Sequence, residues 1–168
     1  MIKIGSNISS FSTYSCQPKT KEELSLIIKK RMYEEGNKCD LNDIDVSLIT
    51  DMEFVFCGTD FNGDISEWDT SKVKDMSSMF SESKFNQDIS NWNVSSVADM
   101  SLMFKESRFN QPIGDWDVSH VTLMYSMFWN SKFNKDISRW KINNACDIEN
   151  MFTGCPIKEE HKPKSQQK

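Results

Sequence analysis

One pattern constrains the fold of this chain more than any other feature: a unit of 24 residues recurs four times without an insertion. In each unit a Phe-Asn pair is followed, at fixed distances, by Ile, Trp and a Met-Phe pair. The Phe-Asn pairs begin at residues 61, 85, 109 and 133, and the tryptophans are residues 68, 92, 116 and 140. A period of about 20–50 residues is typical of a solenoid, in which each unit buries its apolar edge against the next.

A degenerate unit precedes the regular ones. Leu41 and Phe56 lie 24 residues before Ile65 and Phe80, and smaller apolar residues fill the positions between them. Terminal repeats commonly depart from the consensus in this way. The sequence therefore predicts about five coils, stacked at the spacing of paired strands, about 4.8 Å.

Two spacings alternate inside one unit, for which residues 85–108 serve as the example. Residues 89–95 form a short stretch with β-branched residues, which favours a strand. Val97, Met100, Met103 and Phe104 then follow the i, i+3, i+6, i+7 spacing of a short helix. We therefore expect an α/β solenoid in which each unit contributes one strand and one short helix.

The segments outside the repeats are expected to close the ends. Thr20 and Glu23 form a capping box, an apolar stripe follows, and Gly36 is the expected stop, so a helix over 21–35 should lie across the open end. Residues 1–19 fit either a strand or a loose arm. The predicted division is an N-terminal arm (1–19), the capping helix with the degenerate first coil (20–58), four regular repeats (59–156) and a polar tail (157–168).

Composition excludes several classes of protein. The formal net charge is −5 and the pI is near 5.1, so a basic surface for nucleic acid is not expected. The N-terminus lacks the apolar run of a secretory signal peptide, and no stretch is apolar enough to insert into a membrane. The five cysteines are an odd number without a C-x-x-C pair, which favours a reduced chain. We expect a cytoplasmic or phage-virion-associated protein.

The repeated motifs resemble those of the BspA-like leucine-rich-repeat surface protein family, which carry Phe-Asn-x-x-Ile-x-x-Trp-Asx-x-Ser-x-Val-x-x-Met-x-x-Met-Phe. The resemblance covers residues 37–156, and the helix at 21–36 and the Gly-Cys-Pro-Ile-Lys-Glu-Glu stretch at 154–160 are similar to the family's usual ends. It implies a leucine-rich-repeat-like single-strand solenoid of bacterial, phage or protist type. By analogy it also implies surface adhesion or protein binding, with the cell surface as an alternative location.

Two polar columns could hold ligands, but each has a structural interpretation that we favour. The asparagine column should bond backbone groups at the corners of neighbouring coils, and the aspartate column should form local turns rather than a calcium site. These columns are Asn62, Asn86, Asn110 and Asn134, and Asp64, Asp88 and Asp136 with Pro112 in the remaining place. The repeated Met and Phe residues are expected to be core rather than a ligand groove.

No enzyme motif accompanies the repeats. Cys146, Cys155 and His161 lack the spacing and the fourth ligand of a zinc site. His120 beside Ser119 is the only plausible base in the body of the chain, and no repeat supplies a nucleophile with an orienting acid. The sequence therefore implies no catalysis, no metal and no cofactor.

Departures from the repeat are more informative, because the fold does not require them. Leu123, Tyr125 and Trp129 replace polar or charged residues of the other units, and Leu102 also departs from polar equivalents. We predict that these four residues contact a partner. The alternative is that Trp129 covers a coil edge and shields Phe104 or Phe133.

These features favour a non-catalytic protein–protein interaction module, because the main asset of a solenoid is a long regular face. The alternative is a structural or self-assembling component, for example of a virion or a cell surface, and an enzyme or toxin is the least favoured class. The expected partner is a protein, neither nucleic acid nor membrane insertion is expected, and homo-oligomerisation stays open.

Overall fold

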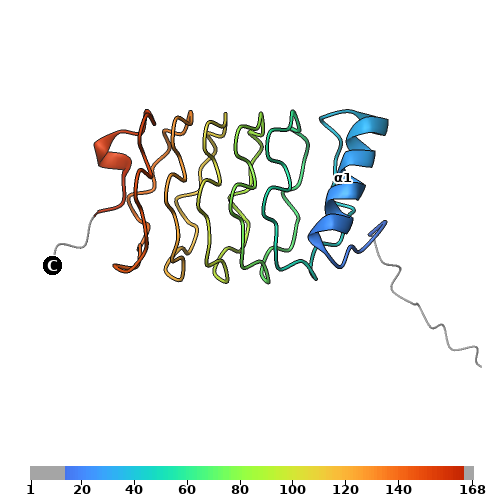
Figure 1. Ribbon diagram of the computed structural model, residues 1–168, viewed down its shortest axis with the longest axis horizontal. Helices are drawn as coiled ribbons and strands as arrows, with labels where there is room; N and C mark the ends of the chain where they lie inside the picture. Colours follow the sequence, from blue (N-terminus) through green and yellow to red (C-terminus); the bar gives the residue numbers. More distant parts are fainter. Residues whose placement is uncertain (1–13, 165–168) are drawn as a thin grey trace, which may run out of the picture.

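The computed structural model describes residues 14–164, which form a stack of five coils with a helix at each end (Figure 1). Helix α1 (Lys21–Glu35) lies across the N-terminal end, and the short 3-10 helix η1 (Glu159–His161) lies at the other end. Within residues 14–164 there is no further helix, and pairing between coils is limited to isolated parallel bridges. No helix of this part of the chain is long and apolar enough to span a bilayer.

Helix α1 confirms the predicted N-terminal cap. The Thr20 hydroxyl accepts the N–H of Glu23 at 3.3 Å, and the Glu23 carboxylate accepts the N–H of Lys19 at 2.7 Å. The helix ends at Gly36, whose φ of 89° suits a residue without a Cβ. Leu24 and Ile28 are buried in the core cluster, so α1 covers the apolar edge of the first coil.

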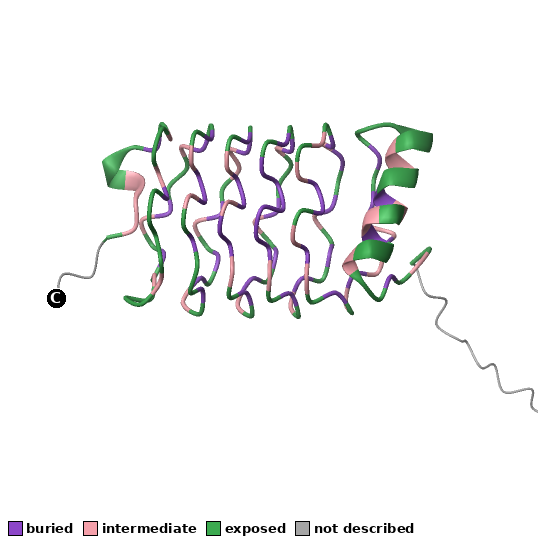
Figure 2. Cartoon of the chain, in the orientation of Figure 1, coloured by how far each residue is buried: buried purple, intermediate pink, exposed green. Residues whose placement is uncertain are grey.

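The core consists of aromatic ladders that run along the stack. In the first ladder, ring centroids in successive coils are 5.5, 5.7, 5.6 and 5.9 Å apart, and in the second they are 6.0, 6.2 and 6.3 Å apart. The ladders are Phe56, Phe80, Phe104, Phe128 and Phe152, and Phe61, Phe85, Phe109 and Phe133. Figure 2 shows buried residues alternating with exposed ones along each coil. The Phe residues and methionines are therefore core, as predicted.

Polar side chains tie each coil to its neighbour. Asn86 Oδ1 accepts the backbone N–H of Asn110 at 2.8 Å, and the same bond links each asparagine of the column to the next coil. The indole Nε1 of Trp92 donates to the Ile65 carbonyl of the preceding coil at 3.0 Å, and the other three repeat tryptophans do the same. The asparagine column is therefore structural, as expected, because it satisfies corner N–H groups that no sheet would satisfy.

The predicted strand over 89–95 is wrong. Two turns occupy this segment: Trp92 N–H donates to the Ile89 carbonyl at 3.1 Å, and Val97 N–H donates to the Val94 carbonyl at 3.0 Å. These bonds within the coil take up backbone groups that a strand would offer to its neighbour. The bridge column instead lies a few residues later, at Asp51, Asp75, Asp99, Leu123 and Asp147.

The predicted short helix over 97–104 is also wrong, because this segment is a series of β-turns. Met103 N–H donates to the Met100 carbonyl at 3.3 Å, and Ser107 N–H donates to the Phe104 carbonyl at 3.2 Å. The third residues of these turns, Leu102 and Glu106, have φ of 59° and 54°, as in type II turns. The chain is thus a solenoid of turns rather than an α/β solenoid of strands and helices.

The turn series forms because it lets alternate backbone N–H groups reach the next coil. The N–H groups of 100, 102, 104 and 106 donate to the carbonyls of 123, 125, 127 and 129 at 2.7 to 3.0 Å. In a helix these N–H groups would donate to carbonyls of the same coil. A helix of two turns also forms too few hydrogen bonds to offset the unfavourable free energy of its nucleation. Since each turn carries its apolar residues inward, consecutive turns produce the three-residue spacing that resembles a helical stripe.

Candidate functional site

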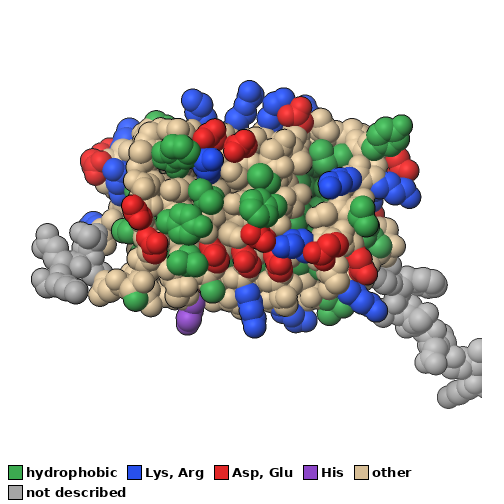
Figure 3. Space-filling view, in the orientation of Figure 1, with side chains coloured by type: hydrophobic (Ala, Val, Ile, Leu, Met, Phe, Trp, Pro, Cys, Tyr) green, Lys and Arg blue, Asp and Glu red, His purple; other side chains and the backbone are tan. Residues whose placement is uncertain are grey.

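The turn series of successive coils form one long face of the stack, and an aspartate column runs along it. Its carboxylate Oδ1 atoms accept the N–H of the residue two positions later at 2.8 or 2.9 Å. The column consists of Asp51, Asp75, Asp99 and Asp147. Figure 3 shows a row of acidic side chains along the face in view, with hydrophobic side chains beside it in the middle and C-terminal part.

The fourth coil breaks this column. Leu123 stands where the other coils have aspartate, and no side-chain oxygen accepts the N–H of Tyr125 in the described part of the chain. Tyr125 itself is 37% exposed, whereas its equivalents Ser77 and Ser101 are buried and bond the aspartate. Leu123 is 36% exposed. This coil therefore lacks a hydrogen bond that its neighbours have and presents two apolar side chains instead.

Leu102 lies directly beside these residues, because its N–H donates to the Tyr125 carbonyl at 3.0 Å. It is half-buried and occupies the left-handed region, with φ of 59°. This conformation suits glycine or asparagine and costs a bulky residue about 1–2 kcal/mol. The equivalent position holds phenylalanine in the first coil (Phe54, φ of 61°), serine in two coils and asparagine in the last, so the fold does not require leucine there.

Trp129 completes the group and lies in the same turn series as Leu123 and Tyr125. It is half-buried, unlike the four repeat tryptophans, which are 4% exposed. The ammonium group of Lys105, on the preceding coil, lies 5.1 Å from the centroid of the Trp129 ring. Lys105 in turn lies 3.6 Å from the carboxylates of both Glu82 and Glu106. The immediate neighbour of Trp129 is therefore a paired cation.

The structure thus brings all four predicted contact residues onto one face of two neighbouring coils. We name Leu102, Leu123, Tyr125 and Trp129 the apolar patch. Carboxylates border it on two sides: Asp99, Asp147 and Glu149 from the column side, and Glu82 and Glu106 from the corner side. Its chemistry is that of a contact surface, with aromatic and aliphatic groups inside a charged rim.

The predicted base does not lie in a catalytic arrangement. The Ser119 hydroxyl donates to Asp117 Oδ1 at 2.7 Å and lies 3.2 Å from His120 Nδ1. The serine therefore stands between the acid and the histidine, whereas a triad needs the acid to orient the histidine. Asp117 is engaged by Ser119, which holds the pKa of its carboxyl below the ordinary value. This group forms a local turn on an exposed corner.

Cys146 and Cys155, which lack the spacing of zinc ligands, have different surroundings in the structure. The Cys155 thiol donates to the Phe133 carbonyl at 3.1 Å, and burial together with Asp147 raises the pKa of Cys146 to about 11. Residues 14–164 contain no group of three or more His, Cys, Asp or Glu that could hold a metal ion. A second set of aspartates forms local turns, as expected: the Asp64, Asp88 and Asp136 carboxylates accept turn N–H groups at 2.8–2.9 Å.

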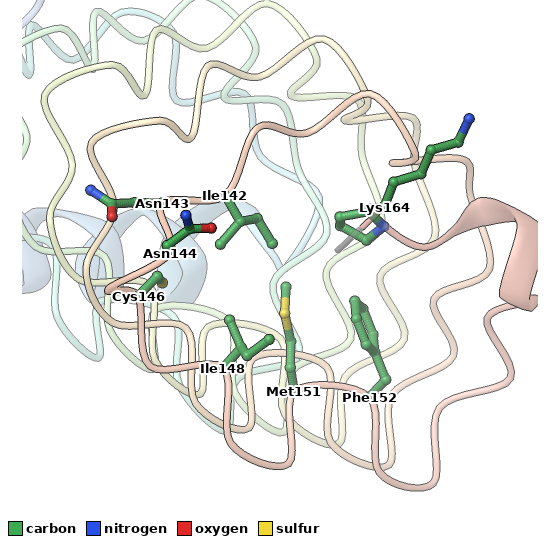
Figure 4. A pocket seen from close by; sticks show the side chains of 9 residues that line it. Ile142, Asn143, Asn144, Cys146, Ile148, Met151, Phe152 and Lys164 are labelled. Carbon is green, nitrogen blue, oxygen red and sulfur yellow. The ribbon is translucent and has the colours of Figure 1, made fainter. Parts of the chain in front are cut away.

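Sequence analysis missed a feature at the C-terminal end of the stack. The last coil has a cavity of about 210 Å³ into which Ile142, Met151 and Phe152 point (Figure 4). The N–H groups of residues 148, 150, 152 and 154 have no acceptor among residues 14–164, although their equivalents in each earlier coil bond the next one. Ile148 is 50% exposed in a column otherwise filled by buried methionines.

The fold and its surface define a repeat protein built as a solenoid of 24-residue coils with regularly stacked Phe and Trp residues. The chain belongs to the family described as Mycoplasma protein of unknown function, DUF285, whose model matches residues 28–130 and again 82–163. Searches of curated proteins and of solved structures found no significant match.

Proposed function

We propose that this protein is a non-catalytic protein–protein interaction module that binds its partner through the apolar patch. One observation carries the proposal: the fourth coil alone replaces the aspartate that bonds the turn, and it exposes Tyr125 where Ser77 and Ser101 are buried. Leu123 stands in place of that aspartate, and Leu102 in the preceding coil adds a bulky residue in the left-handed region, as Phe54 does in the first coil. Local rules that are broken without a gain to the fold are expected at functional sites.

The energetic scale supports this interpretation. A left-handed leucine costs about 1–2 kcal/mol, and a missing hydrogen bond at a turn costs about 1 kcal/mol. The free energy of unfolding of a domain is about 5–15 kcal/mol, so these two costs lower it by a substantial fraction. Exposed tyrosine and tryptophan contribute strongly to contacts when a partner excludes water from them.

Site-specific photo-crosslinking in cells that express the full chain tests the proposal. A photoreactive residue at position 125 is compared with one at position 33, which lies on α1 and holds the 90%-exposed Tyr33. The proposal predicts a discrete protein adduct from position 125 that disappears with Trp129→Ser. Equal adducts from both positions, or none from position 125, would contradict it.

We further propose the finer kinship with BspA-like leucine-rich-repeat proteins, supported by the repeated motif. The proposed location is the cytoplasm or a phage virion, with the cell surface as the alternative. Protease treatment of intact producing cells and of purified particles distinguishes these locations, because only a surface-exposed chain is cut in intact cells.

A second candidate function, a self-assembling structural component, is favoured by the two ends of the stack. The C-terminal end has four unbonded N–H groups, and the carbonyls of 51, 53, 55 and 57 in the first coil accept no backbone hydrogen bond within residues 14–164. These rows match in register, but α1 lies at the N-terminal end. Sedimentation equilibrium over a wide concentration range tests this candidate: growing mass supports it, and a constant monomer mass contradicts it.

A further inference from the structure

We infer that the partner surface received by the apolar patch is a cationic amphipathic peptide segment, with apolar side chains flanked by lysine or arginine. This inference rests on the proposed function and specifies its partner. It follows from the charge around the patch rather than from the patch alone. The same four residues in a neutral or basic rim would favour a different partner.

The rim is acidic on both sides of the apolar residues. Asp99, Asp147 and Glu149 lie on the side of the aspartate column, with Asp99 and Asp147 bridging directly to Leu123 in the neighbouring coils. Asp147 and Glu149 are exposed and Asp99 is half-buried. Figure 3 shows acidic side chains below and above hydrophobic side chains of this face, and basic side chains along the edge beyond the upper ones. A partner that covers the patch must therefore offer cations at the edge formed by Asp99, Asp147 and Glu149.

Lys105 does not reverse this charge. Lys105 lies 3.6 Å from Glu82 and 3.6 Å from Glu106, so its charge is already paired with two carboxylates. It also lies over the Trp129 ring, at 5.1 Å from the centroid. This arrangement shows that the ring accepts a cation next to two glutamates. A lysine or arginine of the partner would find the same two chemical features at the patch edge.

The same charges disfavour other macromolecules. Phosphates of a nucleic acid and head groups of an anionic membrane would meet carboxylates on both sides of the patch, which is repulsive. An acidic amphipathic peptide would bury its apolar residues equally well but would face the same repulsion. Apolar contact thus supplies affinity, and the rim selects the sign of the partner's charge.

The test uses the purified full chain and three synthetic peptides of 18 residues, an arbitrary length chosen as about five helical turns. The first contains only leucine and lysine with the leucines on one helical face. The second has the same composition with the leucines scattered, and the third replaces every lysine with glutamate. Binding is measured by amide and indole chemical shifts in low and high salt, and the affected residues are mapped onto the structure.

The inference predicts that the first peptide shifts the signals of Tyr125 and the Trp129 indole and binds at least about 10-fold more tightly than either control. High salt should weaken this binding, since the rim is exposed. The double variant Tyr125→Ser with Trp129→Ser should lose at least 10-fold in affinity. The matched control, Leu26→Ser with Tyr33→Ser on α1, removes residues that are 68% and 90% exposed and should bind normally.

Three results would overturn the inference: equal binding of the glutamate peptide, equal binding of the scattered peptide, or binding that the patch variant leaves unchanged. These results separate the inference from the proposed function. If position 125 still gives its adduct in cells while the lysine peptide fails, only the charge of the partner is wrong. If both fail, the patch is not the binding surface.

Discussion

The asparagine column allows a sharp test of what holds the coils together. Asn86 Oδ1 accepts the N–H of Asn110 at 2.8 Å, and Asn110 is half-buried between its neighbours. Asn86→Ala removes the acceptor and leaves this N–H without a partner, which costs about 1–2 kcal/mol. For a domain of this size, each kcal/mol corresponds to about 2–4 °C, so the melting temperature should fall by about 2–8 °C.

Asn86→Asp is the matched control, because aspartate keeps an Oδ1 atom in the same place. The hydrogen bonds of the Asn86 side chain in the described structure all use this oxygen as an acceptor, so the aspartate variant should stay within about 0.5 kcal/mol of the parent at neutral pH. Urea unfolding of both variants, followed by circular dichroism, measures the difference. The reasoning fails if alanine is tolerated as well as aspartate, or if aspartate destabilises as much as alanine.

Three further predictions concern backbone strain, acid and thiol reactivity. Glu82 has a φ of 58° and belongs to a column that also contains Gly58 and Gly154. Because asparagine tolerates this left-handed conformation and valine does not, Glu82→Asn should raise the free energy of unfolding by about 0.5 kcal/mol and Glu82→Val should lower it by about 1–2 kcal/mol. Urea titrations measure both changes. Turn donors hold the pKa values of Asp64 and Asp117 below the ordinary value in the folded chain. The two carboxylates therefore contribute their full stabilisation above about pH 4, and this contribution is lost as the pH falls through their lowered pKa values. A free energy of unfolding that declined between pH 7 and 5 instead would contradict this. The pKa of Cys146, about 11, keeps its thiol protonated, so iodoacetamide at pH 8 should alkylate it about 100-fold more slowly in the folded chain than in urea. Mass spectrometry of the digested protein measures both rates, and equal rates would contradict the prediction.

The repeat predicted the architecture because its period records the stacking directly. Phe, Trp and Asn residues 24 apart become neighbours one coil apart, so the ladders, the core and the asparagine bonds follow from register alone. The capping helix was equally predictable, because Thr20, Glu23 and Gly36 act through local backbone geometry.

The internal structure of a coil was not predictable from apolar spacing. Met100, Met103 and Phe104 have the spacing of a helix, but a series of turns with left-handed residues at 102 and 106 places the same side chains inward. Spacing reports which side chains are buried and is silent about which backbone acceptor each N–H uses. The left-handed positions hold phenylalanine, leucine, serine, glutamate and asparagine as well as glycine, so composition gave little warning of them.

The four patch residues were found from departures in register, and their proximity follows from stacking. Their acidic rim could not be read in the same way, because Glu82 and Glu106 belong to another column. Glu82 meets the patch through Lys105, whereas Glu106 also donates its backbone N–H to the Trp129 carbonyl at 2.7 Å. The open C-terminal end was missed for a related reason. Ile148 matches its apolar column, and only the lack of a further coil in the described structure leaves it exposed.

The most direct test of the turn solenoid is the measurement of scalar couplings across hydrogen bonds by nuclear magnetic resonance on isotope-labelled protein. The structure places the N–H of Phe104 2.9 Å from the carbonyl of Met127, one coil further along. The account predicts a coupling between the Phe104 nitrogen and the Met127 carbonyl carbon. A coupling from the Phe104 nitrogen to the Met100 carbonyl carbon, four residues earlier as in a helix, would contradict it.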